Sequence, residues 1–164
     1  MSYLEDLNLL ESELEGHPLD GLEELSSLLD WQYKRIEQNM AIVTVQGQFQ
    51  TYSINLIWNE QSNSLLMETA LNIAFDDVSE GYIPSTLMDI NTRLWLGHFV
   101  YSEQSKVTFK HTLLTAYLEH IEQLIQTTRT ECDRFYTIFF MIQKCDVNDK
   151  DKIFLALTDS EGKA

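Results

Sequence analysis

The sequence is short of the residues that build disulfide frameworks, phosphate-binding loops and cationic surfaces. Its 164 residues include two cysteines, two prolines, six glycines and 11 lysines and arginines together. A small secreted domain that depends on disulfides usually carries more cysteines in paired spacings, so we expect Cys132 and Cys145 to be free thiols. The glycines stand singly and match no phosphate-binding motif, which argues against nucleotide binding of that kind.

The charge of the chain is strongly one-sided. Aspartate and glutamate number 26, which leaves a formal net charge of −15. Binding to phosphate backbones or anionic lipids requires clustered cations, so neither nucleic acid nor a membrane is expected as a partner. No run approaches the roughly 20 apolar residues of a membrane span, and the acidic start lacks the basic region of a secretory signal. These features predict a cytoplasmic protein.

Residues that could carry chemistry are present but scattered. The four histidines form no paired ligand spacing, so we predict no metal site. Cys132 stands between Glu131 and Asp133, whose charges raise rather than lower a thiol pKa, and this favours a core contact over a nucleophile. The adjacent pair Asp76 and Asp77 is typical of a turn and a helix cap. We therefore predict no catalytic residue, no bound cofactor and no enzyme activity.

The N-terminal end is a concentrated anion. The first 30 residues hold nine acids and no lysine or arginine. Leucines at positions 4, 7, 10 and 14 fit a short amphipathic helix, whereas the charge density equally fits a solvated arm. We divide the chain into an acidic arm over residues 1–16 and a single domain over residues 17–164, because no linker or repeat divides the remainder.

The apolar periodicity switches between helix and strand twice along the chain. A period near 3.6 predicts helices over residues 18–30, 82–96 and 117–143, the last with a regular apolar stripe. A period of two predicts one hairpin between residues 43 and 75 and a second over residues 98–114. The tail around residues 153–157 predicts one more short docking helix. The fold class is therefore α+β, with an antiparallel sheet of about five strands covered on one face by the helices over 82–96 and 117–143.

The run around Trp95 has more apolar residues than one helix stripe can bury. Leu94, Trp95 and Leu96 are consecutive, so at least one of them should face a partner. Trp58 falls at the end of a predicted hairpin strand, and His98 follows the predicted end of the helix. We predict that these five residues form a partner or dimer interface, with core packing as the alternative for each tryptophan.

Four segments resemble the YbjN family of bacterial sensory transduction regulators: HPLDGLEEL at 17–25, INTRLWLGHF at 90–99, ECDRFYTIFFMI at 131–142, and the ending LTDSEGKA. The resemblance spans roughly residues 17–164, and its most specific parts are RLWLGHF and ECxRFY. It implies a fold like that of type III secretion chaperones, namely a helix, three strands, a helix, two strands and a long helix, commonly as a dimer. Thr137 stands where related sequences usually have proline, which predicts an uninterrupted long helix. The resemblance implies no reaction, substrate or catalytic residue.

Two classes of function follow from these observations. The first is a non-catalytic, chaperone-like or regulatory homodimer that binds an extended segment of another protein. The helix over 82–96 and the second hairpin would form the dimer, which leaves the other sheet face for the client. The alternative is a sensor domain that holds a small molecule near Trp58, Trp95 and His98. An unrecognised enzyme is a third class, since a fold alone does not exclude a catalytic site.

Overall fold

The computed structural model describes residues 16–114 and 117–144. The predictions for the acidic arm before residue 16, for Cys145 and for the tail helix concern residues outside these ranges. The described helices are α2 (Leu22–Leu28), α3 (Asp77–Glu80), α4 (Ile83–Asn91) and α5 (Leu118–Gln143). The described strands are β1 (Gln32–Glu37), β2 (Met40–Gln46), β3 (Thr51–Asn59), β4 (Ser64–Ala70), β5 (His98–Tyr101) and β6 (Val107–Leu113).

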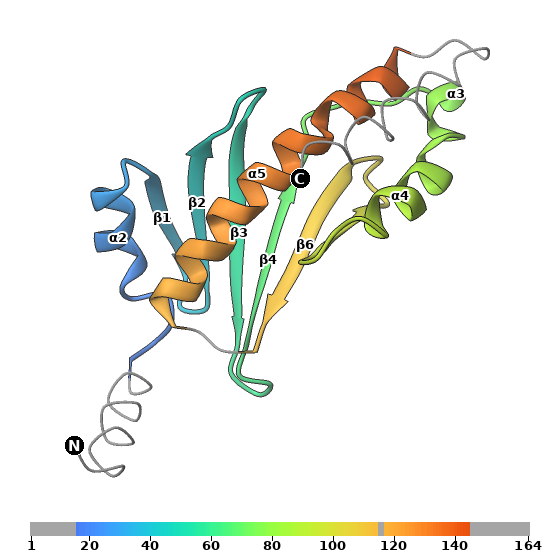
Figure 1. Cartoon of the computed structure of the whole chain (residues 1–164). Helices are drawn as coiled ribbons and strands as arrows, with labels where there is room; N and C mark the ends of the chain where they lie inside the picture. The colour runs from blue at the N-terminus through green and yellow to red at the C-terminus, as the bar shows by residue number, and fades with distance from the viewer. Residues whose placement is uncertain (1–15, 115–116, 145–164) are drawn as a thin grey trace.

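Within the described residues, the strands form one antiparallel sheet in the order β1-β2-β3-β4-β6-β5 (Figure 1). The predicted α+β class and antiparallel pairing are confirmed, but the sheet has six strands rather than about five. Four strands, not three, precede the helices α3 and α4. The strand that was not predicted is β1, because its sequence QYKRIE shows little apolar alternation. Its Arg35 is held by polar contacts instead, donating to Asp20 Oδ1 at 3.3 Å and to the Glu37 carbonyl at 2.9 Å.

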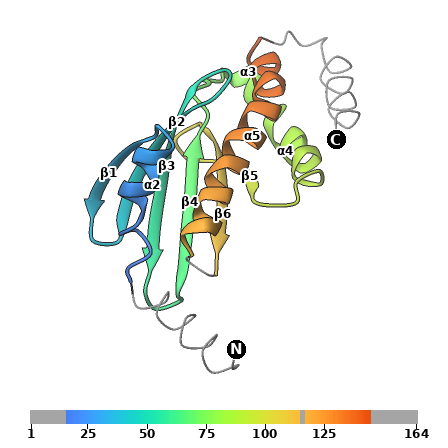
Figure 2. The same cartoon turned by 60° about the vertical axis from the view of Figure 1, so that its left-hand side comes forward.

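Alternation along the strands divides the sheet into two different faces. On the covered face, Val43, Ile54, Met67 and Phe109 have no solvent exposure. Both α2 and α5 lie on this side, as the two views of the ribbon show (Figures 1 and 2). Over the opposite side, which we call the open face, none of the described helices lies. The core therefore lies mainly between the sheet and these two helices, and α4 adds Ile83 and Ile90 to it.

The long helix agrees closely with its prediction. It runs without a break from Leu118 to Gln143, against an expected span of 117–143. The predicted stripe faces the sheet, and its members from Ile121 to Ile142 are buried, including Thr128 and Cys132. Leu118, the first member, is partly exposed where the helix begins. The helix crosses the sheet diagonally (Figure 1), which explains why its stripe needs apolar residues along nearly its whole length.

The two other predicted helices are shorter than expected. In place of a helix over 18–30, residues 17–20 form a turn, with the Asp20 N–H donating to the His17 carbonyl, and α2 ends before Asp30, whose φ is +58°. In place of a helix over 82–96, α4 ends at Asn91. It packs beside β5 at the edge of the sheet rather than across the covered face (Figure 1). The second helix on the covered face is α2 instead.

Candidate interaction surfaces

The segment between α4 and β5 holds the most exposed tryptophan of the described chain. Trp95 is 99% exposed and Leu96 is 47% exposed, whereas Leu94 is partly buried against the core. Met88, on α4, is also exposed. The expectation that the LWL run could not be wholly buried is therefore confirmed. We use the name Trp95 segment for the exposed surface made by Trp95, Leu96 and Met88.

Two contacts fix the backbone that carries Trp95. Gly97 has φ of +70°, and a Cβ at this position would overlap the Phe109 ring and lie 2.8 Å from the Lys110 carbonyl oxygen. Only glycine fits this conformation and this space. The Asn91 side chain then accepts from the Phe99 N–H at 2.8 Å and donates to the Phe99 carbonyl at 2.9 Å. The exposed indole is thus presented by a backbone held at both ends.

The contacts of Asn91 also affect the edge of the sheet. The N–H and carbonyl of an edge-strand residue are the groups with which another strand would pair. At Phe99 of β5 both groups are already satisfied by one amide side chain. Addition of a client strand at this edge is therefore obstructed at Phe99.

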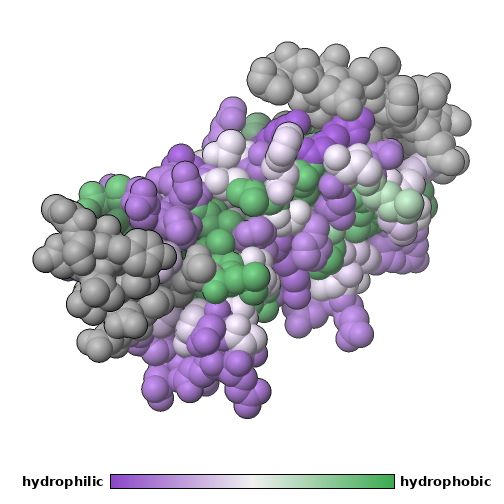
Figure 3. Space-filling view, turned by 60° about the horizontal axis from the view of Figure 1, so that its bottom comes forward, coloured by the Kyte–Doolittle hydropathy of each residue, from purple (hydrophilic) through white to green (hydrophobic). Residues whose placement is uncertain are grey.

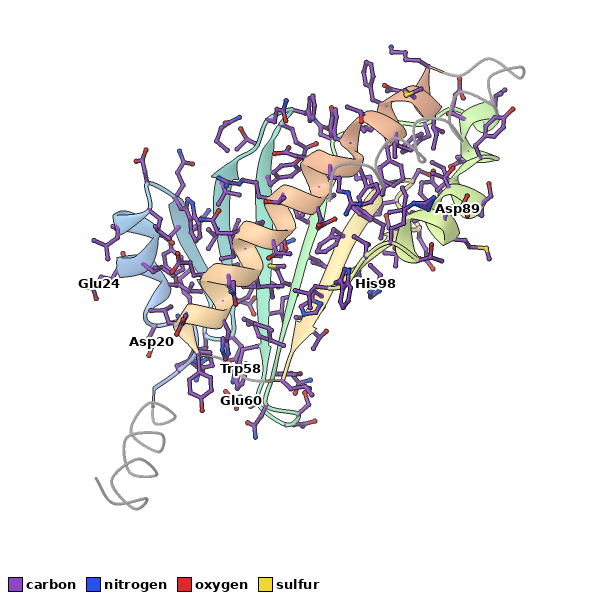
Figure 4. All side chains as sticks on the ribbon, viewed as in Figure 1. Asp20, Glu24, Trp58, Glu60, Asp89 and His98 are labelled. Carbon is purple, nitrogen blue, oxygen red and sulfur yellow. The ribbon has the colours of Figure 1, made fainter. Side chains whose placement is uncertain are left out.

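The five predicted interface residues do not come together. His98 is exposed and lies in register with Lys110 at the β5 edge, next to the Trp95 segment in sequence. Trp58 lies at the lower end of β3 beside Glu60, whereas His98 lies higher up on β5, three strands away (Figure 4). Its side chain is on the covered face, in register with Leu65, and packs partly against the core. Trp58 therefore does not share a surface with the other four.

A separate apolar area occurs at this lower end. Leu65 pairs with Trp58 of β3 and with Leu113 of β6, and the residue after Leu113, Leu114, is exposed. Viewed from below, hydrophobic residues gather in the middle of the molecule with hydrophilic residues around them (Figure 3). The chain passes from this area to residues 115 and 116, which are outside the described ranges.

The open face differs from the rest of the surface in charge. Its residues on the four central strands are Met40, Ile42, Thr44 and Gln46 of β2, Thr51, Ser53, Asn55 and Ile57 of β3, Ser64, Leu66, Glu68 and Ala70 of β4, and Thr108, Lys110 and Thr112 of β6. Glu68 is the one carboxylate on these four described strands, and it pairs with Lys110 at 3.1 Å. A face with aliphatic, hydroxyl and amide groups and almost no net charge is unusual for a chain of −15.

The turn between β5 and β6 forms one wall of a hollow on this face. The hollow has a volume of about 410 Å³ and includes Asn55, Glu68, Thr108 and Lys110 from the sheet, with Ser102 from the turn. Its lining is mainly polar. It is the place on the open face where a small polar molecule would find several hydrogen-bonding groups together.

The chemically reactive candidates have structural surroundings. Cys132 is buried in the core, and burial raises the pKa of its thiol, with smaller contributions from Asp133 and Glu131. Asp76 caps α3 by accepting from the Ser79 N–H, and hydrogen bonds from Ser79 lower the pKa of its carboxyl. In the described residues no three histidine, cysteine, aspartate or glutamate side chains are grouped as metal ligands. No described helix is both long and apolar enough to cross a membrane.

A family model matches residues 18–141, and its description is "YbjN: Putative bacterial sensory transduction regulator". The chain belongs to the YbjN family. The matched region runs from the turn before α2 almost to the end of α5, so it includes the Trp95 segment and the whole open face. The acidic arm precedes it. No significant match was found among curated proteins or among solved structures.

Proposed function

We propose that this YbjN-family chain is a non-catalytic regulatory module of the cytoplasm that forms a homodimer and binds an extended segment of a client protein. The observation that carries the proposal is the 99% exposure of Trp95 on a backbone fixed by Asn91 and Gly97. Tryptophan is among the residues most enriched at the centres of interfaces. A rigid backbone also lowers the entropy lost when such a side chain is buried.

The Trp95 segment is the proposed dimer contact. Burying one tryptophan removes about 150 Å² or more from water, which corresponds to roughly 4 kcal/mol before the costs of association. In a twofold dimer the same surface meets itself, so each gain and each loss occurs twice. A contact through side chains is consistent with the obstruction of the β5 edge by Asn91.

The open face is the proposed client surface. Hydroxyl and amide side chains from β2, β3, β4 and β6 can exchange hydrogen bonds with an extended backbone, and the aliphatic residues between them can contact its side chains. Because Glu68 is paired with Lys110, a client of either charge meets little repulsion over the central strands. The net charge of −15 supports a protein partner over nucleic acid or an anionic membrane.

The dimer is tested by the substitution Trp95→Glu. A charge at the centre of a twofold interface leaves two unpaired charges to be desolvated, so the mass measured by light scattering should fall from dimer to monomer. Because Trp95 makes almost no contact with its own chain, the circular dichroism spectrum should not change. Leu28→Glu is the matched control, since Leu28 is an exposed apolar residue on α2. A folded Trp95→Glu chain that stays dimeric would remove the Trp95 segment from the interface.

The alternative function is the sensing of a small molecule, and the hollow on the open face is what favours it. Trp58, Trp95 and His98 do not converge, so a ligand would bind the hollow rather than those residues. A polar metabolite bound only by the folded protein would raise its melting temperature. Asn55→Trp, which fills the hollow, should abolish that shift if the hollow is the site. A protein segment recovered by affinity purification, lost when Asn55 is changed but not when Leu28 is, would favour the client instead.

A further inference from the structure

Three aromatic rings form a row where the β2–β3 turn meets α5. The Phe49 ring stacks on Tyr136 with centroids 5.1 Å apart and an interplanar angle of 7°. Tyr136 lies 6.5 Å from Phe140 with an angle of 14°, and the Lys144 ammonium lies 5.6 Å from the Phe140 centroid. Phe49 is 43% and Phe140 is 45% exposed. We call Phe49, Tyr136 and Phe140 the aromatic row.

The row is held in place by Asp133. One of its carboxylate oxygens accepts from the Tyr52 hydroxyl at 2.7 Å, and the other accepts from the Gln48 N–H at 2.8 Å. Gly47 makes this approach possible, because a Cβ there would overlap the Tyr52 ring and lie 2.8 Å from Asp133 Oδ1. The β2–β3 turn is thus fastened to α5, and the Phe49 ring is positioned before any partner binds.

A hollow lined in part by two arginines adjoins the place where Asp133 fastens the β2–β3 turn to α5. It has a volume of about 450 Å³ and is lined by the β2–β3 turn and by α5 residues, including Arg129 and Arg134. Arg134 pairs with Glu131 at 3.3 Å. The Arg129 side chain forms no hydrogen bond or ion pair with the residues that the structure describes. The carboxylate of Asp133, also in the lining, is already engaged by two donors.

Two acids lie at this site, Glu131 paired with Arg134 and Asp133 engaged by Tyr52 and Gln48, and the neighbouring sequence carries no others. No aspartate or glutamate occurs from Gln38 to Asn59 or from Arg134 to Lys144. Arg129, Arg134 and Lys144 are three of the chain's 11 lysines and arginines. Exposed rings with cations at both ends suit a segment that combines apolar side chains with carboxylates.

We propose that this surface binds the acidic N-terminal arm of this same chain. The arm combines the two required properties: leucines at positions 4, 7, 10 and 14, and acids at positions 5, 6, 11, 13 and 15, without a lysine or arginine. The leucines contact the aromatic row and the carboxylates approach Arg129 and Lys144. Contacts with Arg129 and Lys144 neutralise part of the negative charge of the arm. They thereby reduce the electrostatic repulsion between the arm and the rest of the chain, whose net charge is −15.

The length of the arm permits this contact within one chain. The described chain starts at Gly16, and Gly21, just before α2, lies against Leu118 at the start of α5. From Leu118, a rise of 1.5 Å per residue puts Arg129 about 16 Å and Phe140 about 33 Å along the helix. Fifteen extended residues span up to about 50 Å, so the arm reaches the whole surface. Fifteen residues in a helix would span about 22 Å and would reach Arg129 but not Phe140, so the contact with the aromatic row requires the arm to be extended.

The test uses the full chain with a nitroxide on the arm. Asn8→Cys is labelled in a Cys145→Ser background, since Cys132 is buried and its thiol is unreactive. The nitroxide should broaden the amide signals of Gly47, Gln48 and the residues from Arg129 to Tyr136, and leave those of the β5–β6 turn sharp. Reduction of the label should restore every signal, and 1 M salt should weaken the effect because it shortens the Debye length to about 3 Å.

Matched variants separate this contact from chance proximity. Charge reversal on the arm by Glu5→Lys with Asp6→Lys should abolish the broadening, as should Lys144→Glu on the exposed end of α5. Lys34→Glu, an exposed cation on β1, should not. In a mixture of spin-labelled chains with isotope-labelled chains that carry no spin label, the signals should stay sharp, and broadening there would show that the arm comes from another copy and would overturn the contact within one chain. Absence of broadening in the native chain, or broadening that survives both charge reversals, would overturn the proposal.

Discussion

The two faces of the sheet use the same strands for different purposes. On β3, Ile54 points to the covered face and has no exposure, whereas Ile57 points to the open face and is only partly buried. On the covered side, α2 and α5 complete a core; on the open side, hydroxyls, amides and one neutralised carboxylate remain available. Alternate residues of the same strand therefore serve different roles: one set stabilises the core and the other is available for recognition. The two roles do not belong to separate parts of the chain.

The largest expected difference comes from deleting the same side chain on each face. Ile54→Ala leaves a cavity in the core and should lower the free energy of unfolding by about 2–5 kcal/mol. Ile57→Ala removes a half-exposed group and should lower it by about 1 kcal/mol. Urea unfolding monitored by circular dichroism measures both. Equal costs would mean that the open face is covered in the native assembly, and the comparison would fail.

Loss of a polar contact should also lower the free energy of unfolding more on the covered face than on the open face, but by a smaller margin. Asp133→Ala leaves the buried Tyr52 hydroxyl without its acceptor, and we expect a loss of about 1–3 kcal/mol. Lys110→Ala breaks the ion pair with Glu68 on the open face, where both side chains are partly exposed, and we expect about 0–1 kcal/mol. Tyr52→Phe in the Asp133→Ala background should cost little more, because the orphaned hydroxyl is then gone. A costly Lys110→Ala would show that the pair belongs to a buried interface.

The smallest expected effect is a dependence of stability on pH from histidine. Burial lowers the pKa of His111 on the covered face from its usual 6.5, and His98 adds a lesser contribution. The folded state therefore disfavours the protonated ring, so its contribution is complete above pH 6.5 and is lost as the pH falls through the lowered pKa. His111→Gln should flatten the stability profile below neutral pH, while His98→Gln, at an exposed site, should leave most of it. If the slope of stability against pH is unchanged in His111→Gln, the pH dependence arises from other titratable groups.

The sequence predicted those parts of the fold that depend on local periodicity. The span of α5 followed from its stripe, and the hairpins followed from alternation. The end of α4 did not, because the LWL run continues an apolar pattern to Gly97, whereas the helix ends at Asn91, whose side chain bonds to β5. Periodicity indicates that an element has an apolar side but does not say which element packs on it, and so the role of α2 on the covered face was missed.

The candidate surfaces divide in the same way. The exposure of part of the LWL run was predictable, since three consecutive apolar residues exceed one stripe, but the sequence did not say which of the three would be exposed. The separation of Trp58 from His98 was not, because it depends on the strand order, which the hairpin patterns leave open. The aromatic row was also missed. Its members Phe49 and Tyr136 lie far apart in the chain, and they meet in the structure where Asp133 fastens the β2–β3 turn to α5.

The most direct test of the proposed homodimer is the mass of the unaltered chain in solution. One chain has a mass of 19.1 kDa, so sedimentation equilibrium should give twice that value at micromolar concentration. On dilution, the mass should fall toward a single chain at higher concentrations for Trp95→Glu than for Leu28→Glu. A mass of 19.1 kDa at all concentrations would contradict the account, since the exposed Trp95 would then have no second copy to bury it.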